Sequence, residues 1–189
     1  MSAALVIAVA FFVGAIPFGV LVARRRGVDL RERGSGNIGA TNAARVLGLS
    51  AGAIVLVLDA GKGVLAVVAA EHISGAPWIV AAAGFAAIAG HCFSPFLGGH
   101  GGKGVATALG VFGLVAPALA LVALGVFLVV AGRTKIVALG SLAGIAAATA
   151  AAFVTRAPEP VCALALVTLA LLLYTHRRNL AGIISGTRV

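Results

Sequence analysis

Long apolar runs are the feature that most limits how this chain can fold. They cover Ser2–Ala23, Val46–Ala70, Pro77–Leu97, Val105–Ala131, Ile136–Val154 and Val161–Tyr174. Runs of about 20 apolar residues are long enough to cross the ~30 Å hydrocarbon core of a bilayer as helices. Hydrophobic residues make up 61% of the 189 positions and charged residues only 10%, so a water-soluble globule cannot hide this surface. The sequence predicts an all-α, polytopic integral membrane protein with one transmembrane domain over residues 1–189.

The positions of the charged residues indicate how many times the chain crosses the membrane. Six spans would put the basic segments Arg24–Arg45 and His176–Arg188 on opposite sides, against the positive-inside rule. Pro117 lies near the middle of the fourth run, and proline is well suited to begin a helix. Breaking that run into helices at about Lys103–Val115 and Pro117–Ala131 gives about seven spans, with the N-terminus outside and the C-terminus in the cytosol. Five spans with re-entrant middle runs are the alternative.

Composition excludes several classes of protein. The net charge of +9 is typical of cytosolic loops in a membrane protein, and a single Trp and a single Tyr offer few rings for stacking on bases. We therefore expect no nucleic-acid partner. Cys92 and Cys162 stand in apolar runs, and no Cys, His or Asp cluster has metal-ligand spacing. We expect no metal, no cofactor and no obligatory protein partner.

Three predicted cytosolic segments carry the polar chemistry: residues 34–45, residues 90–104, and residues 176–187. Glycines in them let backbone amides approach an anion, and Ser, Thr and Asn add neutral donors. Arg45 and Lys103 add full charges, and Lys103 stands where a glycine-rich loop enters a helix. The segments predict phosphate-sized anion sites at the boundary between membrane and cytosol. The simpler alternative is that these segments are flexible turns whose positive charges only set the orientation of the chain in the membrane.

The same segments resemble a known family. Residues 34–45 fit GSGNxGxTNxxR, and residues 90–107 fit GHxF…GGKGVAT except at Gly99 and His100. The third motif, HRxN…GTE, is matched at the residues His176, Arg177, Asn179, Gly186 and Thr187. These motifs resemble the bacterial glycerol-3-phosphate acyltransferase family that uses acyl phosphate (PlsY). Gly182 and Arg188 depart from it, because the family often has arginine and glutamate there.

The resemblance implies an enzyme of the bacterial cytoplasmic (inner) membrane whose active site faces the cytosol. It would move a fatty acyl group from acyl phosphate to the sn-1 hydroxyl of glycerol 3-phosphate, giving lysophosphatidic acid and phosphate. This is the first acylation step of bacterial phospholipid synthesis. Its partners would be these two substrates and the membrane lipids. The alternative is a membrane transporter or binder of a phosphate-bearing anion.

Roles follow for individual residues. We expect His176, Asn179 and Ser35 in the catalytic centre, with His176 as base or proton relay and Ser35 on a phosphate. The substrate-binding set is Ser35, Gly36, Asn37, Gly39, Thr41, Asn42, Arg45, Gly101, Gly102, Lys103, Gly104 and Arg177. Arg45 would bind the phosphate of glycerol 3-phosphate, Asn42 and Asn179 would orient substrates, and the amides of Gly101, Gly102 and Gly104 would join Lys103 on a phosphate. A phosphate oxygen of the acyl phosphate is the other possible proton acceptor.

Other residues are expected to support the structure. Asp59 and Lys62 stand three apart inside the second run, so we expect an i,i+3 ion pair that supports the site, with His91 fixing a loop. The pairs Gly48/Gly52 and Gly140/Gly144 have GxxxG spacing, which is typical of close helix packing. Arg24–Arg26 is interpreted as a topology anchor.

Overall fold

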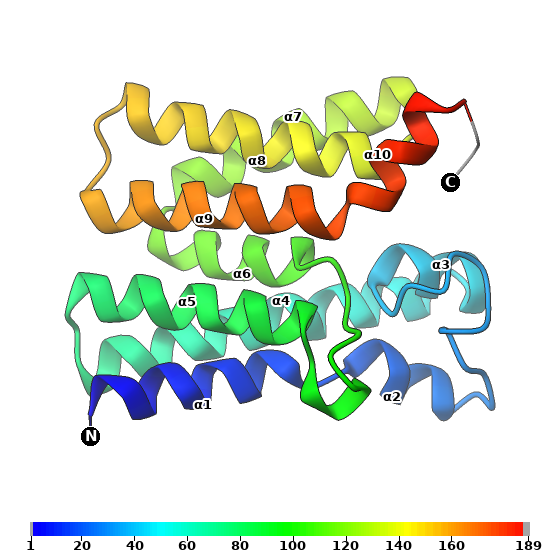
Figure 1. Cartoon of the computed structure of the whole chain (residues 1–189), viewed down its shortest axis with the longest axis horizontal. Helices are drawn as coiled ribbons and strands as arrows, with labels where there is room; N and C mark the ends of the chain where they lie inside the picture. Colours follow the sequence, from blue (N-terminus) through cyan, green and yellow to red (C-terminus); the bar gives the residue numbers. More distant parts are fainter. Residues whose placement is uncertain (1, 187–189) are drawn as a thin grey trace. The chain divides into compact units, whose positions relative to one another are not determined.

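A computed structural model describes residues 2–186, and all regular structure in that range is helical (Figure 1). Thr187 and Arg188, two positions compared with the family motif, lie outside the described residues. The chain divides into two compact units, Met1–Val111 and Phe112–Val189. The predicted all-α membrane fold is confirmed.

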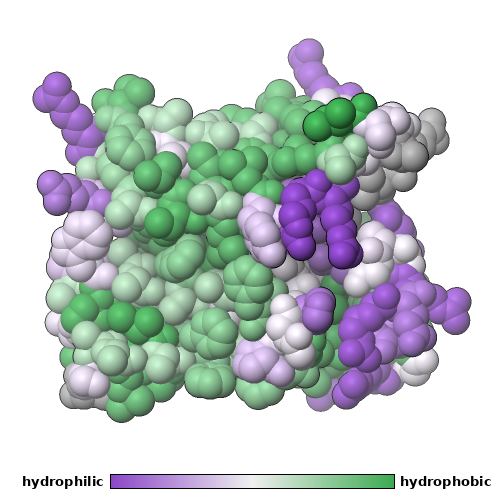
Figure 2. All heavy atoms as spheres, viewed as in Figure 1, coloured by the Kyte–Doolittle hydropathy of each residue, from purple (hydrophilic) through white to green (hydrophobic). Residues whose placement is uncertain are grey.

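The first unit contains the helices of the N-terminal half. They are α1 (Ala3–Ala15), α2 (Phe18–Arg24), α3 (Ala40–Leu47), α4 (Leu49–Ile73), α5 (Pro77–Cys92), the short 3₁₀ turn η1 (Pro95–Leu97) and the start of α6 (Val105–Val115). Helix α1 packs along α5 and α4, and α3 packs on α4. Figure 2 shows hydrophilic side chains at the end of this unit where α2 and α3 meet, whereas α1 presents mainly apolar ones.

A proline interrupts the first span. Helices α1 and α2 together have the length of one crossing, Ala3–Arg24, but the helix breaks at Ile16 and Pro17. Proline has no N–H and restrains the residue before it, so regular helical bonding stops there. Side chains from other elements serve the carbonyls beside the break: Ser94 Oγ donates to Ala15 at 2.7 Å and Lys62 Nζ donates to Ile16 at 3.0 Å.

Glycines allow close contact between helices in the first unit. A Cβ on Gly14 of α1 would meet the backbone of Ala87 in α5, and one on Gly52 of α4 would meet Ala44 of α3. The expectation for Gly48 was wrong. This residue has φ +94°, joins α3 to α4, and would have no atom within 4 Å of an added Cβ. It is a junction, where positive φ favours glycine.

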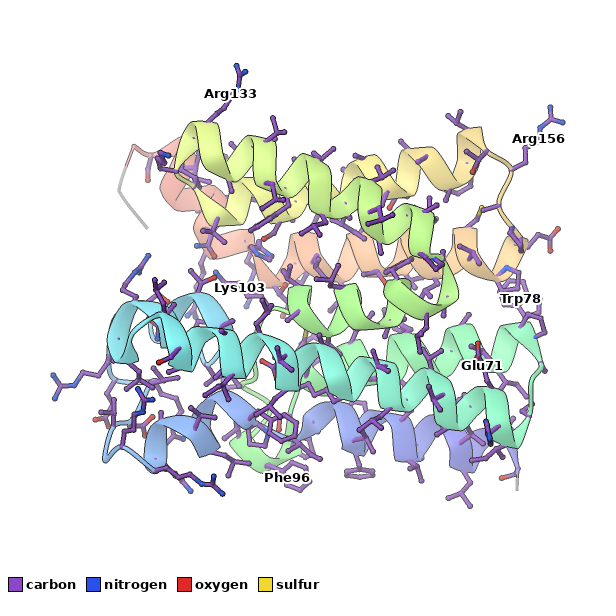
Figure 3. The ribbon with its side chains drawn as sticks, turned by 180° about the vertical axis from the view of Figure 1, so that it is seen from behind. Glu71, Trp78, Phe96, Lys103, Arg133 and Arg156 are labelled. Atoms are coloured by element: carbon purple, nitrogen blue, oxygen red, sulfur yellow. The ribbon has the colours of Figure 1, made fainter. Side chains whose placement is uncertain are left out.

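The second unit is built from α7 (Pro117–Thr134), α8 (Val137–Val154), α9 (Glu159–Thr175) and α10 (Arg177–Ile184). Helix α8 packs against α7 and α9, and short turns make consecutive long helices antiparallel (Figure 1). Figure 3 accordingly places Arg133 and Arg156 at opposite ends of this unit. The glycines Gly140 and Gly144 face α7, as their spacing predicted.

The predicted break in the fourth run is present. Helix α6 ends at Val115 and Pro117 begins α7. Within the described residues five helical segments are long and apolar enough to cross a membrane, or six when α9 and α10 are joined across their 59° bend, and α6 has 11 residues. Seven spans and the N-out orientation stay predictions. The second run also begins later than expected, at Leu49, because residues 40–47 form the separate helix α3.

The contact between α4 and α6 can be tested with two glycines of one helix. A Cβ on Gly63 would meet the Thr107 carbonyl and Val111 of α6, whereas one on Gly61 would meet nothing within 4 Å. We expect Gly63→Ala to lower the unfolding free energy by about 1–3 kcal/mol through overpacking, and Gly61→Ala to leave it unchanged or raise it. Thermal unfolding in detergent measures both. Equal melting temperatures for the two variants would contradict this packing.

Candidate functional site

The first glycine-rich loop is organised by one buried amide. The Asn42 side chain accepts a hydrogen bond from the Ser35 N–H at 2.9 Å. Its own N–H groups donate to the backbone carbonyls of Leu30, Arg33 and Asn37 at 3.2, 3.0 and 2.8 Å. Sequence analysis expected Asn42 to bind substrate. In the structure its polar atoms hold the loop that presents Ser35.

The backbone of this loop accounts for several residues of the first motif. Gly34 and Gly36 have φ of +59° and +71°, a region that L side chains rarely adopt. The Asn37 carboxamide accepts the Gly39 N–H at 2.9 Å and so shapes the turn that enters α3. Ser35 and Gly36 are exposed, whereas Asn37 and Gly39 are partly buried. Ser35 therefore contributes the only exposed polar side chain among these four residues.

Helix α3 presents Thr41 and Arg45 on its exposed face, since they are four residues apart and both are exposed. Its opposite face packs into a small buried cluster with Ala23, Leu30, Ala43 and Val55. Arg26 Nη1 donates to the Leu47 carbonyl at 2.8 Å, which satisfies one of the terminal carbonyls of α3. This contact goes beyond the topology anchor expected for Arg24–Arg26. Nothing in the sequence separates Arg26 from Arg24 and Arg25, because its partner is a backbone carbonyl 21 residues away.

The second loop folds back onto the end of α5. The N–H groups of Gly101 and Gly102 donate to the carbonyls of Cys92 and His91, both at 3.0 Å. These bonds satisfy carbonyls that the end of a helix leaves without partners. Sequence analysis expected the two amides to surround an anion, and the structure instead uses them inside the protein. A Cβ on Gly101 would meet the His91 carbonyl, and one on Gly102 would meet the His91 ring.

Lys103 follows directly and is the charged group of this loop. It is partly buried, and burial together with the positive charge of nearby Arg45 lowers the pKa of its amine below the usual lysine range. The first and second predicted segments therefore bring two cations close together within the first unit. Figure 3 shows Lys103 toward the end of this unit that carries α3, while Glu71 and Trp78 lie at the other end. Adjacent cations of this kind suit a phosphate group.

Behind the second loop lies a buried polar cluster. Lys62 Nζ is 2.9 Å from Asp59 Oδ1 and 2.7 Å from His91 Nδ1, and all three side chains are at most 4% exposed. Asp59 Oδ1 also lies 3.6 Å from His91 Nδ1. The expected i,i+3 ion pair is therefore present, and His91 joins it. Ser94 was not among the residues expected from the sequence. A signal for such a residue was present, because the proline inside the first span breaks a helix and the freed carbonyls need side-chain donors in a membrane.

The third segment belongs to the second unit, at the junction of α9 and α10. His176 is 2% exposed, and its Nδ1 lies 2.8 Å from the Leu172 carbonyl, which can only accept a hydrogen bond. Arg177 Nη1 donates to the Tyr174 carbonyl at 2.8 Å, and its guanidinium lies 4.1 Å from the Tyr174 ring centroid. Asn179 is partly buried in the first turn of α10. The expected convergence of this segment with the other two stays a prediction.

The fold defines an integral membrane protein made of apolar helices, and the first unit carries the glycine-rich loops with Arg45 and Lys103. The chain belongs to the glycerol-3-phosphate acyltransferase family, whose model matches residues 4–186. It is 50% identical over 184 residues to the glycerol-3-phosphate acyltransferase of Geobacter metallireducens, covering 97% of this chain and 94% of that protein. The Aquifex aeolicus relative of the same name is 39% identical over 187 residues, covering 98% and 97%.

Two solved structures are also similar to this chain. One is PlsY (YgiH), an integral membrane glycerol 3-phosphate acyltransferase, in its glycerol 3-phosphate form, with TM-score 0.95 and 38% identity. The other is the lysophosphatidic acid form, with TM-score 0.93 and 37% identity. Each comparison covers 100% of this chain and 95% of the solved one. The family resemblance of the motifs is confirmed.

The closeness of Arg45 and Lys103 has a measurable consequence. Removing a neighbouring positive charge makes protonation easier, so Arg45→Gln should raise the pKa of Lys103. The rate at which an amine-reactive reagent labels Lys103, followed against pH by mass spectrometry, should then have its midpoint at higher pH. Labelling of Lys135, in the second unit, is the internal control. An unchanged Lys103 midpoint would show that the two cations do not share a site.

Proposed function

We propose that this protein transfers a fatty acyl group from acyl phosphate to the sn-1 hydroxyl of glycerol 3-phosphate, producing lysophosphatidic acid and phosphate. The electrostatic influence of Arg45 on Lys103 within the first unit carries the proposal, because both substrates bear phosphate and two motifs of the family supply these cations. The names of the relatives support an acyltransferase, and the two solved forms support glycerol 3-phosphate and lysophosphatidic acid as ligands.

The reaction exchanges one acyl–oxygen bond for another. The sn-1 oxygen attacks the acyl carbonyl carbon and forms an ester, while the bond from that carbon to the phosphate oxygen breaks. Phosphate leaves with the electron pair, and the hydroxyl proton passes to an acceptor. The mixed anhydride is already activated, so the protein's tasks are to bind, to orient and to stabilise charge on the carbonyl oxygen. No cofactor or metal has a part in this proposal.

The proposed substrate contacts come from polar groups of the first unit, of which Ser35, Thr41 and Arg45 are exposed. Arg45 and Thr41, on one face of α3, bind the phosphate of glycerol 3-phosphate, with Ser35 beside them. Lys103 and the backbone at Gly104, which has φ +87°, bind the phosphate of the acyl donor. The remaining members of the expected set shape the loops: Gly36, Asn37, Gly39, Asn42, Gly101 and Gly102.

His176 is the proposed proton acceptor. The Leu172 carbonyl holds the proton on Nδ1, so in the neutral ring the lone pair lies on Nε2, the nitrogen that can take a proton. Asn179, one turn into α10, orients a substrate or polarises the acyl carbonyl. Arg177 is held on Tyr174 in this structure and would have to move to reach a substrate. A phosphate oxygen of the acyl donor is the competing acceptor.

The setting proposed for the reaction is the bacterial inner membrane, with one transmembrane domain over residues 1–189 and the site on the cytosolic face. The acyl chain and product would exchange with membrane lipids. A transporter of a phosphate-bearing anion is not favoured, because the intramembrane charges Asp59 and Lys62 are used against each other and His91.

The donor can be tested directly. Purified protein in lipid vesicles should form lysophosphatidic acid from palmitoyl phosphate and glycerol 3-phosphate, releasing one phosphate per product. Palmitoyl-CoA in place of palmitoyl phosphate should give no product, since the proposed site recognises the donor by a phosphate on its carbonyl. Arg45→Ala is the matched loss-of-function control. Product from the CoA ester but none from the acyl phosphate would refute the proposed donor.

The proton acceptor can be tested with two variants of His176. If His176 takes the proton, both His176→Ala and His176→Asn should lower kcat by roughly 10²–10⁴-fold with KM little changed. Asn keeps a hydrogen-bonding group but cannot take a proton at neutral pH, so near-normal kcat in that variant would assign the proton to the substrate phosphate. Rates are compared only between variants with matched melting temperatures in detergent, because His176 joins α9 to α10.

A further inference from the structure

Lys62 is a buried charged side chain of the first unit that contacts groups from several segments. Its Nζ lies 2.9 Å from Asp59 Oδ1, 2.7 Å from His91 Nδ1 and 3.0 Å from the Ile16 carbonyl oxygen. The lysine ammonium donates to the Ile16 carbonyl and the His91 ring, and its charge pairs with the Asp59 carboxylate. The Phe18 ring lies 5.9 Å from the same nitrogen. Lys62 is therefore placed to hold other groups and not to bind a substrate.

The contact with His91 leads to the second glycine-rich loop. His91 Nδ1 accepts from Lys62, so the proton of the neutral ring is on Nε2. That nitrogen lies so close to Gly102 that a Cβ there would collide with it. The His91 carbonyl also accepts the Gly102 N–H at 3.0 Å. The His91 carbonyl thus bonds Gly102 and its ring lies against Gly102, and the next residue is Lys103.

The contact with Ile16 ties this arrangement to the broken first span. Lys62 serves the Ile16 carbonyl at the break, and Ser94 serves the carbonyl before it, that of Ala15, at 2.7 Å. Ser94 stands at the start of the loop and Gly102 at its end. Both ends of the loop are therefore fixed to one region of the protein, while Pro95, Phe96 and residues 98–100 between them are exposed.

From these contacts we infer that Lys62 is a positioning residue of the acyl transfer reaction, acting through His91 and Gly102 to set where Lys103 stands. The expected fall in kcat/KM rests on the proposed function. The expected change in the position of the loop rests on the structure alone. Without the ammonium, the His91 ring loses its donor and can turn away from Gly102. A displacement of about 1 Å in a substrate-binding group can cost roughly 100-fold in rate.

A paired set of variants separates positioning from stability. Lys62→Met leaves the Asp59 carboxylate buried without its partner, so it should lower the melting temperature as well as activity. Adding Asp59→Val removes that charge and should restore the melting temperature toward the unmodified protein, but it gives His91 no donor. We expect kcat/KM of the double variant for palmitoyl phosphate to stay at least about ten-fold low.

A second readout does not depend on activity. Burial lowers the pKa of Lys103, so a loosened loop should move the midpoint of Lys103 labelling to higher pH in the double variant. The control is Thr149→Val in α8 of the second unit, a buried residue with hydrogen bonds of 2.8 and 3.3 Å to the carbonyls of Ile145 and Ala165. It should lose stability with no change in the labelling of Lys103.

The outcomes are distinct. A double variant with a shifted labelling midpoint and low kcat/KM supports the positioning role. The positioning role is overturned if the double variant keeps the kcat/KM and the Lys103 labelling midpoint of the unmodified protein. It is also overturned if Thr149→Val shifts the Lys103 labelling midpoint as the double variant does. If the unmodified protein fails to use palmitoyl phosphate, the proposed function fails, while the labelling midpoint still decides what Lys62 does.

Discussion

The helix break at Pro17 leaves two backbone carbonyls, those of Ala15 and Ile16, that accept hydrogen bonds from side chains elsewhere in the first unit. A bilayer offers no water to a broken helix, so exposed carbonyls must find partners within the protein. Lys62 of α4 and Ser94 of the second loop provide them at Ile16 and Ala15. A lysine buried for this purpose needs a counter-ion, and Asp59, one turn earlier, supplies it. The interruption of one span thereby joins three segments of the chain.

The same contacts explain why a polar loop can be held firmly beside apolar helices. Gly101 and Gly102 return the loop to the terminal carbonyls of α5, and the absence of a Cβ at Gly102 lets the His91 ring lie against it. The first loop is held differently, by the carboxamide of Asn42 on three carbonyls. In both loops buried groups are used for shape, which leaves Ser35, Thr41, Arg45 and Lys103 as the candidates for substrate contact.

The separation of loop-shaping residues from exposed polar residues changes the interpretation of the motifs. A glycine-rich motif with Asn, Ser and a cation suggests that most of its residues touch the ligand. Here many of them make the backbone geometry possible, and we propose that a few charged or hydroxylated residues contact the phosphate. Under the proposed function, mutation of Asn42 or Gly102 would act through the shape of the loop, whereas mutation of Arg45 would act on substrate binding.

The sequence by itself determined four features through local signals. The length of the apolar runs indicated the membrane fold, and a proline indicated the break before Pro117. The i,i+3 spacing indicated the ion pair of Asp59 and Lys62, and the dense motifs indicated the family. Tertiary structure decided which motif residues face inward. Asn42 reaches Leu30 across 12 positions, Lys62 reaches Ile16 across 46, and Ser94 reaches Ala15 across 79. Such partners depend on which helices pack together, since a backbone carbonyl has the same chemistry at every residue and only folding shows which ones need a donor.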